Sequence, residues 1–365
     1  IGMSFFLPVD LSFSLWFFYL FRKGLQVPVA IAGGHSYPRG SGRFFDQQAQ
    51  GAWLGMAVLA LWLTRRHFAT VLRQIVRPQT ALDRAEGGGL RWAFAGLIAS
   101  MLFILGFSFY AGMSVWVILV FFGIDYAIFL ALSRARAESA PAHQNLWAVN
   151  ASEIMVNVFG SRRLGPSSLA VIALFRFFNR NYPSHPMPEY LENLKIGEQA
   201  NIRLRPLVIA MMLAAVVAIP ICFWILLDRS YDGGVPFTFS GREGFRAMYQ
   251  GLTHPSGTNY GAVLAMGLGF SFTLVLMAMR HQFLWWPFHP VGYAYSINFG
   301  TDYIWFCLVI SSAAKWTILK CGGLRAHRKA IPFFLGLVLG EFVVGSFWSA
   351  LGIILHTPPY TFSIH

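Results

Sequence analysis

Apolar residues along the chain are gathered into long runs, which short polar or basic stretches separate. Most runs have about 14 to 25 residues with few charges, close to the length that a membrane-spanning helix requires. The runs are residues 4–21, 51–64, 92–111, 114–132, 207–227, 261–279, 303–319 and 331–355. This pattern predicts an all-α integral membrane protein with about eight transmembrane helices.

The stretches between these runs predict how the chain is organised. Glycines and prolines favour loops at residues 24–50 and 228–259. A polar region separates the fourth and fifth runs, and within it residues 167–178 and 189–202 favour interfacial or surface helices. We therefore expect three regions, which are a first membrane group (1–132), a cytoplasmic loop region (133–206) and a second membrane group (207–365).

One aromatic segment, residues 283–297, is apolar but broken by Pro287, Pro290 and Gly292. Proline cannot continue a helix, so we expect a broken or re-entrant element here. Such elements often carry the binding sites of transporters. His289 lies between the two prolines and is a candidate site residue, although an interfacial aromatic belt would also explain the segment.

Charge sets the expected orientation. The formal net charge is +13, and only 12% of the residues are charged, against about 25% in soluble domains. The basic residues follow the second and fourth runs, which places those regions in the cytoplasm and favours contact with anionic lipids. The basic stretch 320–329 is cytoplasmic too only if the broken segment crosses the membrane. No nucleic-acid recognition motif accompanies the charge, so nucleic acid is not an expected partner.

The sequence offers no sign of an enzyme or of a metal centre. It contains no HExxH, GxSxG, P-loop or dinucleotide-binding motif. Its three cysteines, Cys222, Cys307 and Cys321, are widely spaced and have the pattern of small apolar fillers. We therefore expect no catalytic residue, metal or cofactor.

Ionisable residues inside apolar runs are the strongest functional signal, because each costs about 2.5 to 3.5 kcal/mol at the centre of a span. Asp125 lies in the middle of the fourth run, and Glu341 lies in the last run beside a face of small residues. Each is a candidate substrate or proton site, and an interhelical hydrogen bond is the structural alternative. Asp10, Asp302 and Lys315 lie at or near the ends of runs and are further candidates for the pathway.

Two other groups of residues have roles that we predict from their place in the sequence. In the loop 228–259, Arg246, His254 and Asn259 are candidates for an extracellular gate, with an ordered loop as the alternative. Small residues at 261, 265 and 269 form one helical face, for which close helix packing is the expected role.

Several stretches resemble known membrane families. Residues 331–348 (IPFFLGLVLGEFVVGSFW) resemble the last membrane segment of the oligopeptide transporter superfamily. Residues 13–19 (FSLWFFY), 249–257 (YQGLTHPSG) and 287–293 (PFHPVGY) resemble an uncharacterised bacterial multi-span family distantly related to it. Superfamily members are longer, so the resemblance implies a carboxyl-terminal half.

The resemblance implies a secondary transporter, or a protein derived from one, in the bacterial inner membrane. Its expected activity is proton-coupled uptake of oligopeptides or metal chelates. The expected partners are membrane lipids, a small-molecule or peptide substrate, and either further copies of the chain or other membrane subunits. The alternative is a structural or accessory subunit of a larger membrane complex.

Overall fold

The computed structural model describes residues 1–31, 41–76, 89–139, 146–179, 182, 185–233, 238–296 and 299–355. Within these ranges the chain is all-α and contains no strand. The helices form two compact units, each described separately here. Unit 1 holds residues 1–56, 138–149 and 264–365, and unit 2 holds residues 57–137 and 150–263.

These units differ from the three consecutive regions expected from the sequence. Both ends of the chain belong to unit 1, because the first helices pack against the last one. Such contacts join residues some 300 positions apart, for example Ser12 with Leu308 and Ser311 with Ile1. A division by sequence order cannot anticipate pairings of this kind.

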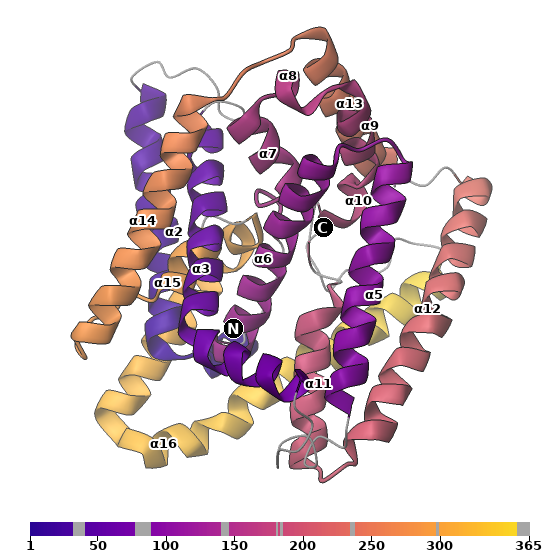
Figure 1. Cartoon of the computed structure of the whole chain (residues 1–365). Helices are drawn as coiled ribbons and strands as arrows, with labels where there is room; N and C mark the ends of the chain where they lie inside the picture. The colour runs from indigo at the N-terminus through magenta and orange to yellow at the C-terminus, as the bar shows by residue number, and fades with distance from the viewer. Residues whose placement is uncertain are drawn as a thin grey trace. The chain divides into compact units, whose positions relative to one another are not determined.

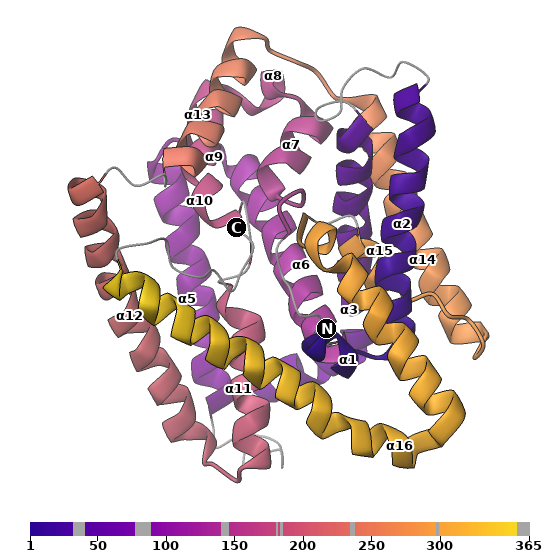
Figure 2. The ribbon, with the colours of Figure 1, turned by 180° about the vertical axis from the view of Figure 1, so that it is seen from behind.

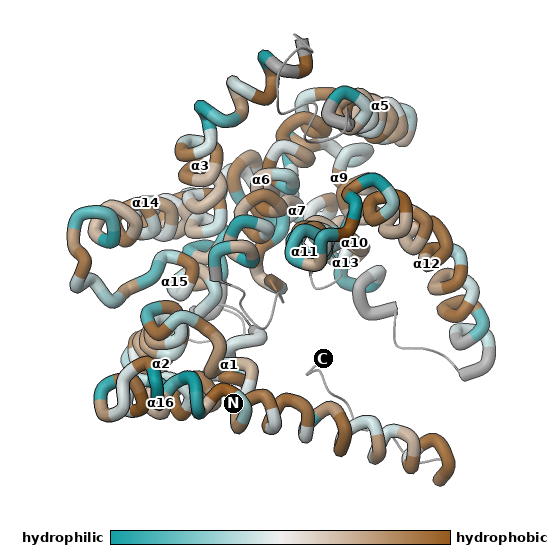
Figure 3. Tube along the Cα trace, turned by 90° about the horizontal axis from the view of Figure 1, so that it is seen from below, coloured by the Kyte–Doolittle hydropathy of each residue, from teal (hydrophilic) through white to brown (hydrophobic). Residues whose placement is uncertain are grey.

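Unit 1 is built around α2 (Val9–Ile31). A short helix α1 (Gly2–Phe6) precedes it, and α15 (Pro290–Ser296) and α16 (Phe299–Ile354) pack against it. Figures 1 and 3 show α15 lying between α2 and α14 (Tyr260–Gln282). The helix α16 bends at Gly323, which has a φ of +62°, and the bend divides it into two arms (Figure 2). Glycine suits this backbone conformation because it has no Cβ atom.

The first part of α3 (Ser41–Val76) crosses α14 at very short range within unit 1. A Cβ atom added to Gly51 would lie 1.9 Å from the carbonyl oxygen of Met266, and one added to Gly269 would lie 2.0 Å from that of Gln48. The close packing expected for the face 261, 265 and 269 is therefore confirmed at Ala265, which is fully buried, and at Gly269, whereas Gly261 is exposed. Small residues allow two backbones to approach in this way.

Unit 2 contains a hairpin of α5 (Gly89–Tyr110) and α6 (Val115–Ser139), and residues 115–137 of α6 belong to this unit. Several further helices complete it. Its apolar core joins α6 to α7 and α9 through side chains such as Phe121, Met155 and Leu169. The remaining helices are α7 (Ala151–Phe159), α8 (Ser161–Leu164), α9 (Pro166–Leu174), α10 (Arg176–Asn179), α11 (Pro186–Gln199), α12 (Leu204–Gly233) and α13 (Thr238–Thr253).

Five helices of the described residues are long and apolar enough to cross a membrane, which indicates a membrane protein. They cover Arg91–Tyr110, Val115–Glu138, Leu204–Asp228, Tyr260–Gln282 and Gly300–Ile354. Figure 3 shows the apolar character of α12 and of the second arm of α16. The helices α2 and α3 are not among the five. In α2 the charged residues Asp10, Arg22 and Lys23 leave too short an uncharged run.

Several expected loops are helical instead. The helix α2 continues to Ile31 and α3 begins at Ser41, so much of the predicted loop 24–50 was wrong. The predicted loop 228–259 contains α13, and residues 320–330 continue α16 as a helix. Single glycines weaken a helix by only about 1 kcal/mol, and packing overcomes that cost.

Candidate functional site

The break between α14 and α15 is the most distinctive element of unit 1. The helix α14 ends at Gln282, residues 283–289 are not helical, and α15 begins at Pro290. Proline suits the first position of a helix, where no N–H is required. All seven residues of α15 are buried. The predicted broken element is thus present, although residues 297 and 298 lie outside the described residues.

Ser14 of α2 ties this broken segment in place. Its Oγ accepts a hydrogen bond from the backbone N–H of His289 at 2.7 Å and donates one to the carbonyl oxygen of Asp10 at 2.6 Å. The His289 Nδ1 atom accepts a hydrogen bond from the Val291 N–H at 3.1 Å, so His289 caps α15. At Gly292 an added Cβ atom would lie 2.4 Å from the Ser14 Cβ atom, so the two helices touch here.

An aromatic cluster surrounds the broken segment. The Phe288 ring lies 4.9 Å from the Phe17 ring and 5.3 Å from the Phe18 ring, measured between centroids. Tyr293 of α15 continues the cluster, at 5.3 Å from Phe18 and 4.8 Å from Phe272 of α14. Ring contacts of this kind add about 0.5 to 1.5 kcal/mol each beyond burial, so the cluster fixes α15 against α2 and α14.

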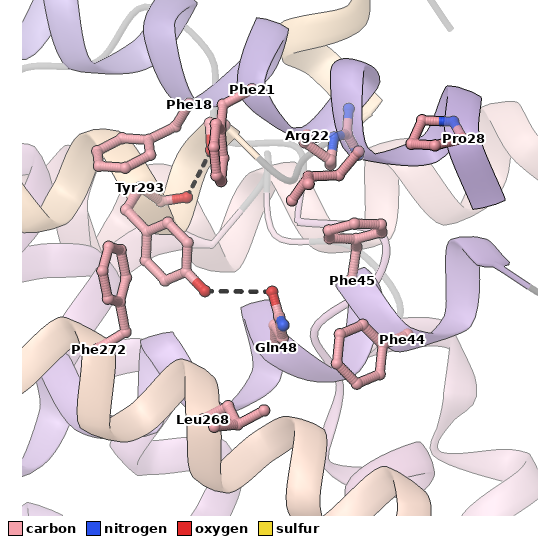
Figure 4. A pocket seen from close by; sticks show the side chains of 12 residues that line it. Phe18, Phe21, Arg22, Pro28, Phe44, Phe45, Gln48, Leu268, Phe272 and Tyr293 are labelled. Atoms are coloured by element: carbon pink, nitrogen blue, oxygen red, sulfur yellow. Dashed lines mark hydrogen bonds between the residues drawn. The ribbon is translucent and has the colours of Figure 1, made fainter.

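Two pockets lie along α2, one on each side of this cluster. The arginine pocket (Figure 4) has a volume of about 650 Å³ and is lined by Phe18, Phe21, Arg22, Leu25, Pro28, Phe44, Phe45, Gln48, Leu268, Phe272, Tyr293 and Ser296. The tryptophan pocket has a volume of about 680 Å³ and is lined by Val9, Asp10, Phe13, Trp16, Leu284, Trp285, Trp286, Pro287, Val309, Ser312, Ala313 and Trp316. Both fall within the usual range of ligand pockets. Phe17 and Phe288 line neither pocket and lie in the cluster between them.

Three of the expected pathway residues have defined partners beside these pockets. Asp10 pairs with Arg280 at 2.5 Å. Asp302 pairs with both Arg22, at 3.0 Å, and Lys23, at 3.2 Å.

Lys315 donates a hydrogen bond to the carbonyl oxygen of Leu7 at 2.7 Å, so Asp302 and Lys315 have separate partners. His289 is buried and interacts electrostatically with Asp10 and Arg280. Unit 1 therefore brings together Asp10, His289 and Lys315 near the start of α2, and places Asp302 beside the middle of this helix.

Asp125 is a separate centre in the core of unit 2. It is only 1% exposed, and its Oδ1 atom has no hydrogen-bond partner within the described part of the chain. The equally buried Tyr182 hydroxyl interacts with its carboxylate. Burial, together with the Asp125 charge, raises the pKa of Tyr182 well above its usual value. A buried carboxyl group of this kind can take up or release a proton.

Phe129, one helical turn after Asp125, connects this centre to His185. The Phe129 ring lies 5.6 Å from Tyr182 and stacks on His185 at 3.9 Å between centroids. The Nε2 atom of His185 is buried without a hydrogen-bond partner among the described residues. Burial lowers the pKa of His185 to about 4. Three titratable side chains thus gather around one aromatic ring.

The remaining candidates lie away from both centres. Glu341 is exposed on the second arm of α16. Arg246 and His254 are exposed on α13 and just after it. The Asn259 side chain caps α14 by accepting a hydrogen bond from the Ala262 N–H at 3.1 Å, and the Asn259 backbone N–H donates to the carbonyl oxygen of Asn157 at 2.9 Å. These contacts give Asn259 a structural role.

The sequence analysis did not single out Ser14, Arg22 or Tyr182. Arg22 directly follows the first apolar run, where a basic residue is common, and Ser14 is one of several serines in apolar runs. Arg176 of α10 was also missed as a site residue. It joins Asn150 at 3.1 Å and Glu243 at 2.9 Å in a buried polar network of unit 2. In the sequence, Arg176 interrupts the short apolar stretch 167–178, and this position could have indicated the network.

No group of three or more histidine, cysteine or acidic side chains within the described ranges could hold a metal ion. In the comparisons with known proteins, no curated protein and no solved structure matches the chain. One family model matches residues 1–364, which is nearly the whole length. The chain belongs to this family, DUF6785, which is described as a family of unknown function.

Proposed function

We propose that the protein is a secondary membrane transporter whose substrate path runs through unit 1, along α2. One observation carries the proposal, namely that His289 and α15, which follow the helix break, are buried and lie between two pockets on the same helix, whereas residues 283–285 are exposed. Non-helical backbone at membrane depth is tolerated only where protein or a watery cavity surrounds it. In transporters, broken helices of this kind form the substrate site.

The aromatic cluster supplies the barrier that such a path requires. On average, the α2 residues that line one pocket lie about ten residues away from the α2 residues that line the other. This separation corresponds to roughly 15 Å along the helix axis. Phe17 and Phe288 stand between these positions. A rotation of either ring would join the pockets, and its return would separate them.

We further propose eight membrane spans plus the broken element, in a bacterial inner membrane. The charges on α2 do not argue against a span, because Asp10 pairs with Arg280 and Arg22 pairs with Asp302. Paired charges cost far less in a membrane than isolated ones. The bent α16 is long enough for two spans, and the broken segment then makes the basic residues after 319 cytoplasmic.

Asp125 is the best candidate for proton coupling. It is buried, and one of its carboxylate oxygens lacks a hydrogen-bond partner among the described residues. When such a group gains or loses a proton, the free energy of burying it changes. This difference can drive a conformational change. The resemblance to oligopeptide transporters adds oligopeptides or metal chelates as the substrate classes to examine first.

The test is uptake by proteoliposomes of labelled oligopeptides and labelled ferric chelates under an inward proton gradient. We expect gradient-dependent uptake that falls at least about tenfold in Asp125→Asn, which cannot exchange the proton. Asp228→Asn, at the exposed end of α12, is the matched control and should transport normally. Uptake that survives replacement of both Asp125 and Glu341 would reject their roles, and absence of any uptake would reject the transporter.

The second candidate is an accessory subunit of a larger membrane complex. The apolar helix α12 favours this accessory role. None of the residues in its most apolar stretch is buried within this chain. Such a surface contacts either lipid or another protein. Purification in a mild detergent separates the two functions, because a stoichiometric partner protein would support the accessory role.

A further inference from the structure

The arginine pocket combines an aromatic wall with a single buried cation. Six aromatic side chains line it, together with Leu25 and Leu268. The Arg22 side chain is only 9% exposed. Figure 4 shows Arg22 beside Phe21 and above the ring of Phe45, with Gln48 and Tyr293 hydrogen-bonded to each other below. A ligand that fills this pocket therefore has a large apolar part and a polar end.

The charges beside the pocket favour an anionic end. Arg22 and Lys23 both pair with the same Oδ1 atom of Asp302, and no acidic side chain among the described residues lines the pocket. Asp46 is the other acidic residue close by in sequence. It lies on the side of α3 opposite Phe44 and Gln48, and it does not line the pocket. A guanidinium in an apolar setting binds a carboxylate strongly and with defined geometry.

The size and the mouth of the pocket favour a single apolar chain. A volume of about 650 Å³ suits one small amphiphile. Phe21, Leu25 and Leu268 are 56%, 42% and 50% exposed, so the apolar wall continues to the surface of the chain. A ligand can therefore enter with its tail along these side chains.

We propose that the arginine pocket binds an amphipathic monocarboxylate, with its carboxylate at Arg22 and its apolar chain along the aromatic wall. That this ligand is also the transported substrate rests on the proposed function, whereas its binding does not. An anionic phospholipid shares part of this chemistry and is the occupant that the experiment must distinguish.

The test is equilibrium binding of labelled oleate to the whole protein in phosphatidylcholine nanodiscs, with oleyl alcohol as the uncharged analogue. We expect oleate to bind at least about tenfold more tightly than the alcohol, because only oleate carries the charge. Arg22→Gln combined with Asp302→Asn should remove that difference, and the remaining partner of Asp302, Lys23, is partly exposed to solvent. Arg136→Gln combined with Glu192→Gln removes an ion pair in unit 2, whose two residues line neither pocket, and should leave the difference between oleate and the alcohol unchanged.

A second variant keeps the proposal falsifiable if the double variant does not fold. Leu268→Trp fills the exposed mouth and should weaken oleate and oleyl alcohol alike. Equal affinities for the two probes, or no effect of Leu268→Trp, would overturn the proposal. Loss of oleate binding in nanodiscs that contain phosphatidylglycerol would also overturn it, by identifying a phospholipid as the occupant. Oleate binding without uptake of any substrate would retain the site and reject transport.

Discussion

At the scale of single residues, a few polar side chains inside apolar surroundings determine how the elements are joined. Ser14 is completely buried and links α2 to the broken segment through the His289 N–H. Asp10, at the start of α2, pairs with Arg280, and Asp302 pairs with Arg22 near the middle of α2. Each of these contacts satisfies a group that would be costly to bury alone.

Replacing Ser14 with alanine should destabilise the protein by about 1 to 3 kcal/mol, because the buried His289 N–H loses its acceptor. The loss is measured as a lower unfolding temperature in detergent. Ser230→Ala is the control, since the Ser230 hydroxyl is exposed and bonds only within its own helix. Equal unfolding temperatures for Ser14→Ala and the wild type would contradict the anchoring role.

His185 should make stability depend on pH. Burial lowers its pKa to about 4, whereas an unfolded histidine has a pKa near 6.5. The unfolded state therefore takes up the proton first, and stability falls as the pH is lowered from about 6.5 to 4. Because His185 is partly exposed, we expect a loss of only about 1 to 2 kcal/mol.

The measurement compares unfolding temperatures at pH 7 and pH 4.5 for the wild type and for His185→Phe, which retains the stacking on Phe129. The variant should lose less stability on acidification than the wild type does. An identical loss in both proteins would assign the pH dependence to other groups.

At the scale of elements, close backbone contacts join several of the helices in addition to apolar packing. The crossing of α3 and α14 depends on Gly51 and Gly269, each of which faces a carbonyl oxygen of the other helix. The packing of α15 on α2 depends in the same way on Gly292. Without a hydrophobic driving force between helices in lipid, such contacts provide much of the association energy.

Gly51→Ala should therefore separate α3 from α14. Its new methyl group would lie 1.9 Å from a backbone oxygen that cannot rotate away, so we expect a cost of at least about 2 kcal/mol. Gly106→Ala in α5 is the matched control, because nothing lies within 4 Å of its added Cβ atom. Thermal unfolding in detergent compares the two, and a tolerated Gly51→Ala would show that the helices cross less closely.

At the scale of the whole molecule, the orientation in the membrane follows from the loop charges. We expect residues 73 and 325 in the cytoplasm and residue 111 outside. The labelling experiment first replaces Cys222, Cys307 and Cys321 with serine, and then introduces single cysteines at Arg73, Ala111 and Arg325. An impermeant maleimide should reach only position 111 from outside intact cells. Labelling of position 325 from outside would show that the broken segment does not cross.

The sequence alone determined those features that depend on neighbouring residues. Long apolar runs indicated an all-α membrane protein, because water-free surroundings force the backbone to bond within each helix. Pro287 and Pro290 identified the broken element, since proline cannot continue a helix. Asp125 was found as an acid within an apolar run, and it is indeed buried.

Only the tertiary structure decided which distant residues meet. The pairs Asp10–Arg280 and Arg22–Asp302 are each separated by 270 or more residues. The two pockets arise because α15 lies beside α2, and the Tyr182 partner of Asp125 comes from another part of unit 2. The hydrophobic pattern of the sequence indicates which side chains are removed from water, but it does not specify which side chains they contact. For that reason the broken segment could be predicted from the sequence, and the pockets beside it could not.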